Sequence, residues 1–178
     1  MSENVFINIK NRSFSVSADV EVPKGGANGV IIAQAGKFGG WSLYLKEGKP
    51  TFAYNYLGLK TYKVGSAKAV PAGKAAVRFE FAYDGGGLGK GGTGTIHVNG
   101  EKVAAGRIDR TQGLVFSADE GADVGVDAET PVSDDYKAGD NRFTGTIRKV
   151  VIKVGPLQLG AADREKIERA HEERKGAE

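Results

Sequence analysis

Residues 13–22 read SFSVSADVEV, in which polar and apolar side chains alternate at every position. The same alternation recurs at residues 75–84, AAVRFEFAYD, where Ala, Val, Phe, Phe and Tyr occupy the odd-numbered positions. A period of two places successive side chains on opposite faces of a strand. Both stretches therefore predict antiparallel β-strands with one face in the core and the other in water.

Turn-forming residues divide the rest of the chain into further strands. The apolar run at 30–33 predicts a strand that is buried on both faces or lies at the centre of a sheet. Alternation at 41–46 and again at 52–56, on either side of a Glu-Gly-Lys-Pro turn, predicts a hairpin. Asn99-Gly100 stands between two alternating segments and predicts a second hairpin with a tight turn.

The C-terminal part of the chain carries weaker strand signals and one irregularity. Residues 114–116 and 123–126 predict two short strands. In the last strand, 143–154, the parity of the apolar positions changes midway. A β-bulge near Arg148 and Lys149 would place both halves of its apolar side on the core.

Together these signals predict an all-β chain that forms a single domain over residues 1–178. About ten short strands, with turns every eight to twelve residues or so, indicate an antiparallel β-sandwich at about residues 5–155. A thin apolar stripe and an acid–base pair at i,i+4 spacing predict a short C-terminal surface helix at about residues 160–175.

The composition excludes several classes of protein. No cysteine is present, so disulfide scaffolds, thiol catalysis and cysteine-bound zinc are ruled out. The net charge is +3, and the bases of the first two thirds of the chain are scattered singly, which argues against nucleic-acid binding. No apolar stretch is long enough to span a bilayer, and residues 1–9 lack the features of an export signal, so no membrane partner is expected.

The segment 113–142 is strongly acidic, with eight Asp or Glu residues against two Lys or Arg. Clustered carboxylates repel one another unless they are solvated, paired with bases or bound to a cation. Their oxygens are the ligands that calcium prefers, so Asp119, Asp123 and Asp127 are candidate ligands of a structural calcium ion. The pattern does not match an EF-hand. Two alternatives stay open: a solvated loop, and ion pairs with nearby bases, namely Arg142, Arg148 and Lys149.

A glycine-rich stretch at 85–92 reads GGGLGKGG and lacks the terminal Lys-Ser/Thr of a phosphate-binding P-loop. It precedes a strand rather than a helix, so no helix N-terminus points at an anion. Glycine backbones allow another surface to approach closely, and a lysine offers one positive charge. The stretch is therefore a candidate ligand or domain-contact loop, with Asp84, Gly87, Lys90 and Gly91 as candidate residues. The alternative is an unusually long hairpin connection.

Histidine and the larger aromatic residues give no catalytic signature. His97 falls on the polar side of its strand with no nucleophile motif around it, so we expect a solvent-facing histidine. Trp41, Tyr54 and Tyr56 would form a platform for a sugar ring if they were exposed. Their alternation places them on the inward side, and we expect them in the core.

Several motifs of this chain resemble the C-terminal region of large bacterial arylsulfatases. The most specific is FEFAYD followed by GGGLGKGG at residues 79–92. The likeness runs in order from about Asn8 to Val154. Its other motifs are NIKNRS at 8–13, FGGWSLY at 38–44, YNYLGL at 54–59, DVGVD at 123–127 and TPV at 130–132. The resemblance implies a concanavalin A-like or laminin-G-like β-sandwich, a jelly roll, attached behind a catalytic domain.

The resemblance does not carry catalysis to this chain. Sulfatases of that family act through a formylglycine made in a Cys/Ser-x-Pro-x-Arg motif, and no residue two positions before the five prolines is Cys or Ser. We therefore expect a chain that is non-catalytic by itself. Its compartment is periplasmic or secreted only if the parent enzyme is exported.

Three functions remain as hypotheses. The resemblance implies an accessory domain that packs on the catalytic domain of a sulfatase and presents the glycine-rich stretch near the substrate. The alternative is a free-standing lectin-like module that binds glycans, with or without calcium. The third is a structural domain without a small ligand, which a large exposed apolar patch would favour.

Overall fold

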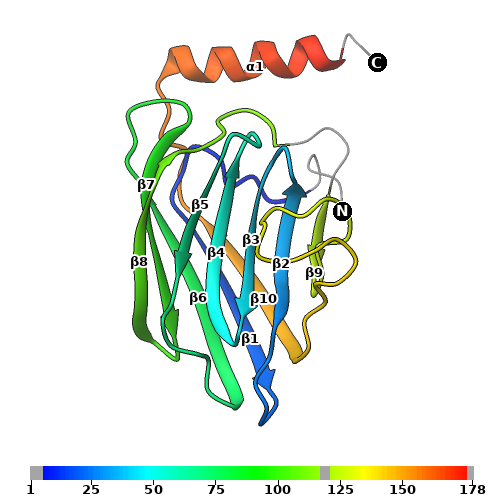
Figure 1. Ribbon diagram of the computed structural model, residues 1–178. Coiled ribbons are helices and arrows are strands. Elements are labelled where there is room, and N and C mark those ends of the chain that lie inside the picture. Colours follow the sequence, from blue (N-terminus) through cyan, green and yellow to red (C-terminus); the bar gives the residue numbers. More distant parts are fainter. Residues whose placement is uncertain (1–5, 117–120, 176–178) are drawn as a thin grey trace.

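The computed structural model describes residues 6–116 and 121–175. Two antiparallel five-stranded sheets lie face to face, and one helix follows them at the C-terminal end (Figure 1). The predicted antiparallel β-sandwich with a short C-terminal helix is therefore confirmed. The two layers are named sheet 1 and sheet 2 below.

Sheet 1 contains the two stretches that alternate most strictly. Their apolar positions face sheet 2, with Phe14 opposite Phe81 and Val16 opposite Phe79 where the first strand pairs with the sixth. The strand order is β10-β1-β6-β7-β8. The strands are β10 (Thr146–Val154), β1 (Phe14–Val22), β6 (Gly73–Tyr83), β7 (Lys90–Val98) and β8 (Glu101–Arg110).

Sheet 2 has the order β5-β4-β3-β2-β9. Its strands are β5 (Lys60–Gly65), β4 (Lys49–Tyr56), β3 (Gly39–Lys46), β2 (Gly29–Gly36) and β9 (Ala122–Val124). Of the two short strands predicted after residue 110, one forms and is shorter than predicted, because Gly125 has a left-handed φ of 81°. Residues 114–116 form no strand, since the Gln112 side chain accepts from the Leu114 N–H and makes a local turn.

Aromatic side chains from both sheets form the centre of the core. Phe52 of β4 stacks on Phe79 of β6, with ring centroids 3.5 Å apart and planes 3° from parallel. Trp41 stacks on Phe52 at 5.8 Å, and its indole N–H donates to Gln34 Oε1 at 2.7 Å. Aromatic rings bury large areas and all three are fully buried, so this stack ties the two sheets together.

The predicted bulge in the last strand is present. β10 pairs with β1 in register up to Asp19 opposite Lys149, and the next residue of β1 then lies opposite Ile147. Arg148 is the extra residue, so Ile147 and Val150 both pack against the core despite their odd spacing.

Part of the glycine-rich stretch belongs to a strand, which corrects the prediction of a loop over residues 85–92. β7 already begins at residue 90, and the connection from β6 is confined to residues 84–89. A Cβ would lie 2.5 Å from Phe81 Cζ at Gly92 and 2.7 Å from Phe79 Cε2 at Gly94. The rings of β6 occupy the space that side chains of β7 would need, so the close approach requires glycine.

Helix α1 (Ala161–Lys175) crosses above one end of the sandwich, called the upper end below (Figure 1). The side chains of α1 that the structure describes are exposed or half-buried, so the helix adds little to the core. Among the described residues, no helix has both the length and the apolarity that crossing a membrane requires.

Candidate binding surface

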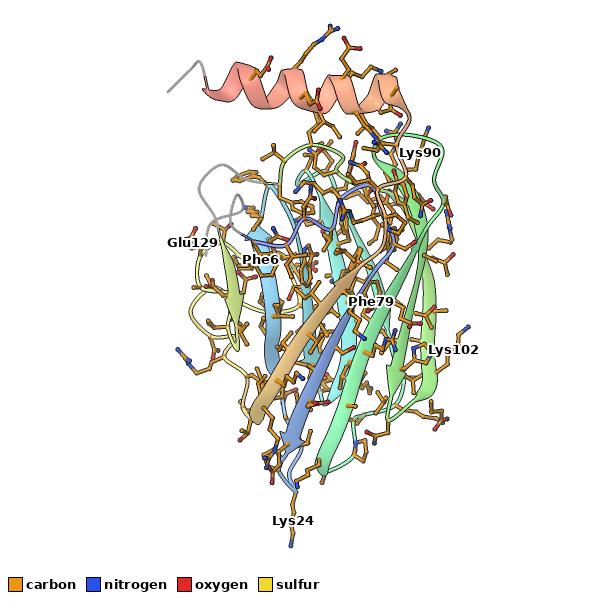
Figure 2. All side chains as sticks on the ribbon, turned by 180° about the vertical axis from the view of Figure 1, so that it is seen from behind. Phe6, Lys24, Phe79, Lys90, Lys102 and Glu129 are labelled. Carbon is orange, nitrogen blue, oxygen red and sulfur yellow. The ribbon has the colours of Figure 1, made fainter. Side chains whose placement is uncertain are left out.

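The outward side of sheet 1 carries small and polar side chains, and this sheet lies nearest the viewer in Figure 2. Every second residue of β1, β6 and β7 points away from the core. These outward side chains form what we call the outer face, and its central members are Ser15, Ser17, Ala76, Arg78, Glu80, Ala82, Thr93, Thr95 and His97. This central part offers hydroxyls and charges but no Phe, Tyr or Trp.

A hollow of about 400 Å³ lies on the outer face. Arg78 and Glu80 line it from β6, and an ion pair of 2.5 Å joins Arg78 Nη2 to Glu80 Oε1. His97 lines it from β7, with its Nδ1 3.9 Å from Glu80 Oε2. That nitrogen is buried and forms no hydrogen bond within the described residues. At 3.9 Å the two atoms are too far apart for a direct hydrogen bond.

Two other hollows are less suited to a ligand. One of about 620 Å³ lies at the lower end and is lined largely by turn residues such as Pro23, Gly73 and Gly145. Another of about 360 Å³ lies beside Tyr44 and Asp135, whose polar atoms are already bonded to each other. The hollow beside His97 differs because it contains a buried polar atom that still lacks a partner.

Asp84, one of the predicted loop residues, lies at the upper end of the outer face. Its carboxylate accepts from Arg107 Nη1 at 3.0 Å and from Nη2 at 2.6 Å. The hydrogen bond from Arg107 lowers the pKa of Asp84, and Arg107 Nη1 also donates to Thr93 Oγ1 at 3.1 Å. The charge of Asp84 is therefore balanced within the fold.

Internal hydrogen bonds hold the connection at residues 84–89. Tyr83 Oη donates to the Gly87 carbonyl and accepts from the Lys90 N–H at 3.0 Å. Asn11 Oδ1 accepts from the Gly89 N–H at 2.9 Å. Burial raises the pKa of Tyr83, which keeps its hydroxyl protonated as a donor. Gly87 therefore has a structural role in this connection.

The four predicted loop residues lie close together at the upper end, where the Asp84 N–H donates to the Gly91 carbonyl at 2.9 Å and a Cβ at Gly87 would lie 3.6 Å from Lys90 Cε, but they differ in role. Gly91 lies inside β7, where a Cβ would be 2.4 Å from the Ile108 carbonyl oxygen. Lys90 is exposed at the upper end, close to the beginning of α1 (Figure 2). Of the four, Asp84 alone has its side chain on the outer face, next to Arg107.

The acidic segment folds back over the outward side of sheet 2, and Figure 1 shows it in yellow in front of this sheet. Val132 packs with Val30 and Ala33 of β2. Tyr136 packs edge-on against Tyr44 of β3, with ring centroids 5.1 Å apart. This second apolar layer explains why β2 is buried on both faces, as its sequence predicts.

Asp127 is the buried centre of this layer, with 2% of its surface exposed. Its Oδ2 accepts from the Val132 N–H at 2.9 Å and from Tyr136 Oη at 2.7 Å. Asn141 Nδ2 donates to the Asp127 carbonyl at 2.9 Å, and Asn141 Oδ1 accepts from the Asp127 N–H at 2.8 Å. Burial, and next the Asp127 charge, raise the pKa of Tyr136, so its hydroxyl stays protonated as a donor. Asp127 therefore anchors the segment.

Asp135 joins the same segment to two lysines of sheet 2. Its Oδ1 lies 2.7 Å from Lys46 Nζ and 3.1 Å from Lys63 Nζ. Its Oδ2 accepts from Tyr44 Oη at 2.5 Å, and Asp134 also pairs with Lys63. These bonds attach the segment to β3 and β5.

These ion pairs correct one interpretation of the sequence. In the described part of the acidic segment, the carboxylates that form ion pairs do so with Lys46 and Lys63 rather than with the bases at 142, 148 and 149. Arg148 instead pairs with Glu21 of β1. The reason is the path of the segment, which crosses sheet 2 and so meets the lysines of β3 and β5.

Acid should weaken this part of the structure through Asp135. Burial alone would raise the pKa of Asp135, but hydrogen bonds from Lys46, Tyr44 and Lys63 outweigh burial and lower it from 3.8 to about 2. Because the folded-state pKa is the lower one, Asp135 stabilises the fold above about pH 4, and this stability is lost as the pH falls towards about 2. Thermal unfolding across this range should show a smaller acid-induced fall in Tm for Asp135→Asn than for the wild type. Equal falls in the two proteins would contradict this assignment.

The predicted calcium site lacks a cluster of ligands in the part of the chain that the structure describes. Asp119 lies outside the described residues. Asp123 Oδ2 accepts from the Ala128 N–H at 3.3 Å, and Asp127 is bonded as above. Within the ranges 6–116 and 121–175, no group of three or more Asp, Glu or His side chains could hold a metal ion. Calcium binding stays a prediction.

The aromatic side chains considered as a sugar platform lie in the core, as their alternation predicts. Trp41 and Tyr54 are buried, and Tyr56 is partly buried against the same core. Tyr54 Oη accepts from the Gln112 N–H at 2.7 Å. A sugar ring therefore has no stacking surface on these three residues.

Sequence reasoning placed His97 on the polar side of its strand but missed its neighbours Arg78 and Glu80. The alternation at 75–84 marks both as outward, yet outward charges are ordinary on any half-buried strand. The deciding fact is the register of β6 with β7, which places Arg78 opposite His97. The Asn99-Gly100 turn sets the pairing of β7 with β8, whereas β6 and β7 are joined by the connection at residues 84–89, whose residues carry no signal for their register.

No family model matches this sequence, and no curated protein matches it. Solved structures match its fold. Domains LG4-5 of the mouse laminin alpha1 chain superpose with a TM-score of 0.58 at 15% identity, over 88% of this chain and 41% of the laminin chain. The Ruminococcus gnavus IT-sialidase CBM40 bound to alpha2,3 sialyllactose gives 0.56 at 13% identity, over 89% and 83%. A SAP-like pentraxin from Limulus polyphemus gives 0.51 at 13% identity, over 83% and 67%.

These matches establish the fold of the chain. It is an all-β sandwich of the concanavalin A and laminin-G type, which confirms the fold that the sequence resemblance implies. Sequence identities of 13–15% show a shared fold and do not show a shared function. None of these three neighbours is a sulfatase, so the arylsulfatase connection stays a prediction.

Proposed function

We propose that this chain is a non-catalytic carbohydrate-binding domain that holds a glycan on the outer face of sheet 1. The observation that carries the proposal is the hollow beside His97. There a buried imidazole nitrogen lacks a hydrogen-bond partner and lies 3.9 Å from a carboxylate oxygen of Glu80. Sugars present hydroxyl groups that donate and accept hydrogen bonds at once, so a hydroxyl placed in the hollow would bond to Glu80 and, once the imidazole ring turns toward the hollow, to His97 as well.

The surroundings of the hollow suit a flat polar ligand. Ser17 and Ala76 lie at its β1 and β6 sides, and Gly100 lies at the adjoining turn. These small side chains leave the strand surface open to a ring that approaches flat. Arg78 is held by Glu80 through one nitrogen, which fixes the direction of the guanidinium before a ligand arrives.

The fold neighbours support the same class of function. The CBM40 structure is bound to sialyllactose, and this chain covers 83% of it, so the two are similar in extent. Laminin domains and a pentraxin share the sandwich, although the chain spans only 41% of the laminin structure. The likeness supports a binding module. The position of the ligand is inferred from the hollow beside His97 and not from the neighbours.

Binding of the full 178-residue chain to a panel of neutral and acidic glycans tests the proposal, with the salt concentration fixed. Glu80→Gln keeps the shape of the side chain and removes its charge. A hydrogen bond to a charged group contributes about 1.5–3 kcal/mol, so we expect Glu80→Gln to weaken binding about 10- to 100-fold. Titration calorimetry on the best ligand of the panel measures this change.

Glu47→Gln is the matched control because it removes the same charge at an exposed turn of sheet 2. Its affinity for the same glycan should equal that of the wild type. Equal affinities of the Glu80 variant and the wild type would move the site away from the hollow. Absence of binding to every glycan would overturn the proposed function.

A second function, packing on another domain, is favoured by an exposed apolar patch at the upper end. The turn at 37–38 meets the turn at 57–59, where a Cβ at Gly58 would lie 3.5 Å from Phe38 Cδ1. Phe38 and Leu59 are 69% and 79% exposed, and Leu57 and Leu114 are exposed as well. Apolar side chains gathered in this way often mark a protein contact, which suits the accessory role that the arylsulfatase resemblance implies.

A further inference from the structure

A row of three basic side chains crosses the outer face at the hollow. Arg78 of β6 lies opposite His97 of β7, and His97 lies opposite Lys102 of β8. Paired residues on neighbouring strands stand about 4.5–5.5 Å apart and point to the same face. Figure 2 shows Lys102 projecting outward from the β8 edge of the sheet.

Arginines already hold most of the carboxylates of this face. Glu80 pairs with Arg78, Asp84 with Arg107, and Glu21 with Arg148 at the β10 side. By contrast, four lysines of the face form no ion pair within the described residues: Lys74, Lys102, Lys149 and Lys153. Asp19, another carboxylate of the face, lies opposite one of these lysines, Lys149. The four lysines still outnumber the carboxylates that no arginine holds, so the surplus charge of the outer face is positive, and Lys102 lies opposite His97 of the hollow.

We infer that the row Arg78, His97 and Lys102 binds the acidic group of a sulfated or carboxylated glycan. This inference rests on the proposed function, because it assigns a ligand class to the same hollow. Lys102 offers three N–H donors and forms no ion pair among the described residues, so an anion need not displace a carboxylate to reach it. Arg78 keeps further donors beyond the one that Glu80 accepts. Glu80 then takes the neutral hydroxyls of the same sugar.

Glycan pairs that differ only in an acidic group test the inference. The probes are lactose, sulfated lactose and sialyllactose, together with dextran and dextran sulfate. We expect the acidic members to bind at least about tenfold more tightly than their neutral partners, with a difference that shrinks as salt is added. Calorimetric titration at low and high salt measures both effects.

Lys102→Gln and Lys137→Gln form the matched pair of variants. Both remove one exposed lysine, but Lys137 lies in the acidic segment over sheet 2. Lys102→Gln should weaken binding of the acidic probes about two- to fivefold, which is the range for an exposed ion pair, and should leave any neutral probe unchanged. Lys137→Gln should change neither.

The outcomes separate this inference from the proposed function. Equal affinity for neutral and acidic probes would overturn the anionic ligand class and leave carbohydrate binding in place. Equal losses in the two lysine variants would mean general charge attraction and would also overturn the row. Absence of binding to every probe would overturn both proposals.

Discussion

Replacing Phe79 by alanine should lower the free energy of unfolding by about 3–5 kcal/mol, the range for a large aromatic residue in a core. Its ring lies 3.5 Å from the Phe52 ring of the other sheet and 6.0 Å from Phe14. Gly94 lies against the same ring and has no side chain that could move into the cavity. The cavity should therefore stay open, which places the loss in the upper part of the range. Urea denaturation monitored by tryptophan fluorescence measures it.

Lys74→Ala is the control for this change because it truncates an outward residue of the same strand. Surface substitutions of this kind usually change stability by less than about 0.5 kcal/mol. A loss below about 1 kcal/mol for Phe79→Ala would mean that the two sheets are not tied together by this stack. It would also weaken the binding proposal, because Phe79 lies between Arg78 and Glu80 and its packing fixes where they point.

The sequence could predict the strands and their faces because both depend on local alternation. Phe79 and Phe81 are inward and Arg78 and Glu80 are outward in the structure, as the period of two requires. The bulge at Arg148 was predictable for the same reason. When the apolar positions of a strand shift from odd to even numbers, one extra residue in a bulge keeps both halves facing the core.

The hollow could not be predicted, because it depends on which strands become neighbours. Ser17 of β1 and His97 of β7 both line it, although 80 positions separate them in the chain. The glycine-rich stretch misled the prediction for a related reason. Glycine in a sequence signals a turn, whereas Gly92 and Gly94 are required by the rings of Phe81 and Phe79 across the strand.

The partners of the acidic segment were equally hidden. Asp135 pairs with Lys46, 89 positions away, and the sequence offered closer bases such as Arg142. Val132 and Tyr136 pack on sheet 2, and this apolar contact sets the path of the segment. The sequence does not show which strands these two side chains meet.

Replacing Asp127 by alanine should lower the free energy of unfolding by about 3 kcal/mol. The Val132 N–H and the Tyr136 hydroxyl would each lose an acceptor in a buried site, and each loss costs about 1–3 kcal/mol. Asp123→Ala is the comparison, because Asp123 accepts one long hydrogen bond of 3.3 Å from Ala128. Its loss should be under about 1 kcal/mol. Thermal and urea unfolding of the three proteins in the presence of chelator measure both values.

Adding calcium to the same proteins decides between an anchor and a metal ligand. A calcium site predicts that the ion raises the wild-type Tm through preferential binding to the native state, and that both aspartate variants lose this increase. An anchor predicts a wild-type Tm that is unchanged by calcium and an Asp127→Ala deficit of the same size with calcium and with chelator. We expect the second pattern, because Asp127 Oδ2 already accepts two hydrogen bonds inside a buried layer. A calcium-dependent rise that disappears in both variants would instead place a metal ion at the acidic segment.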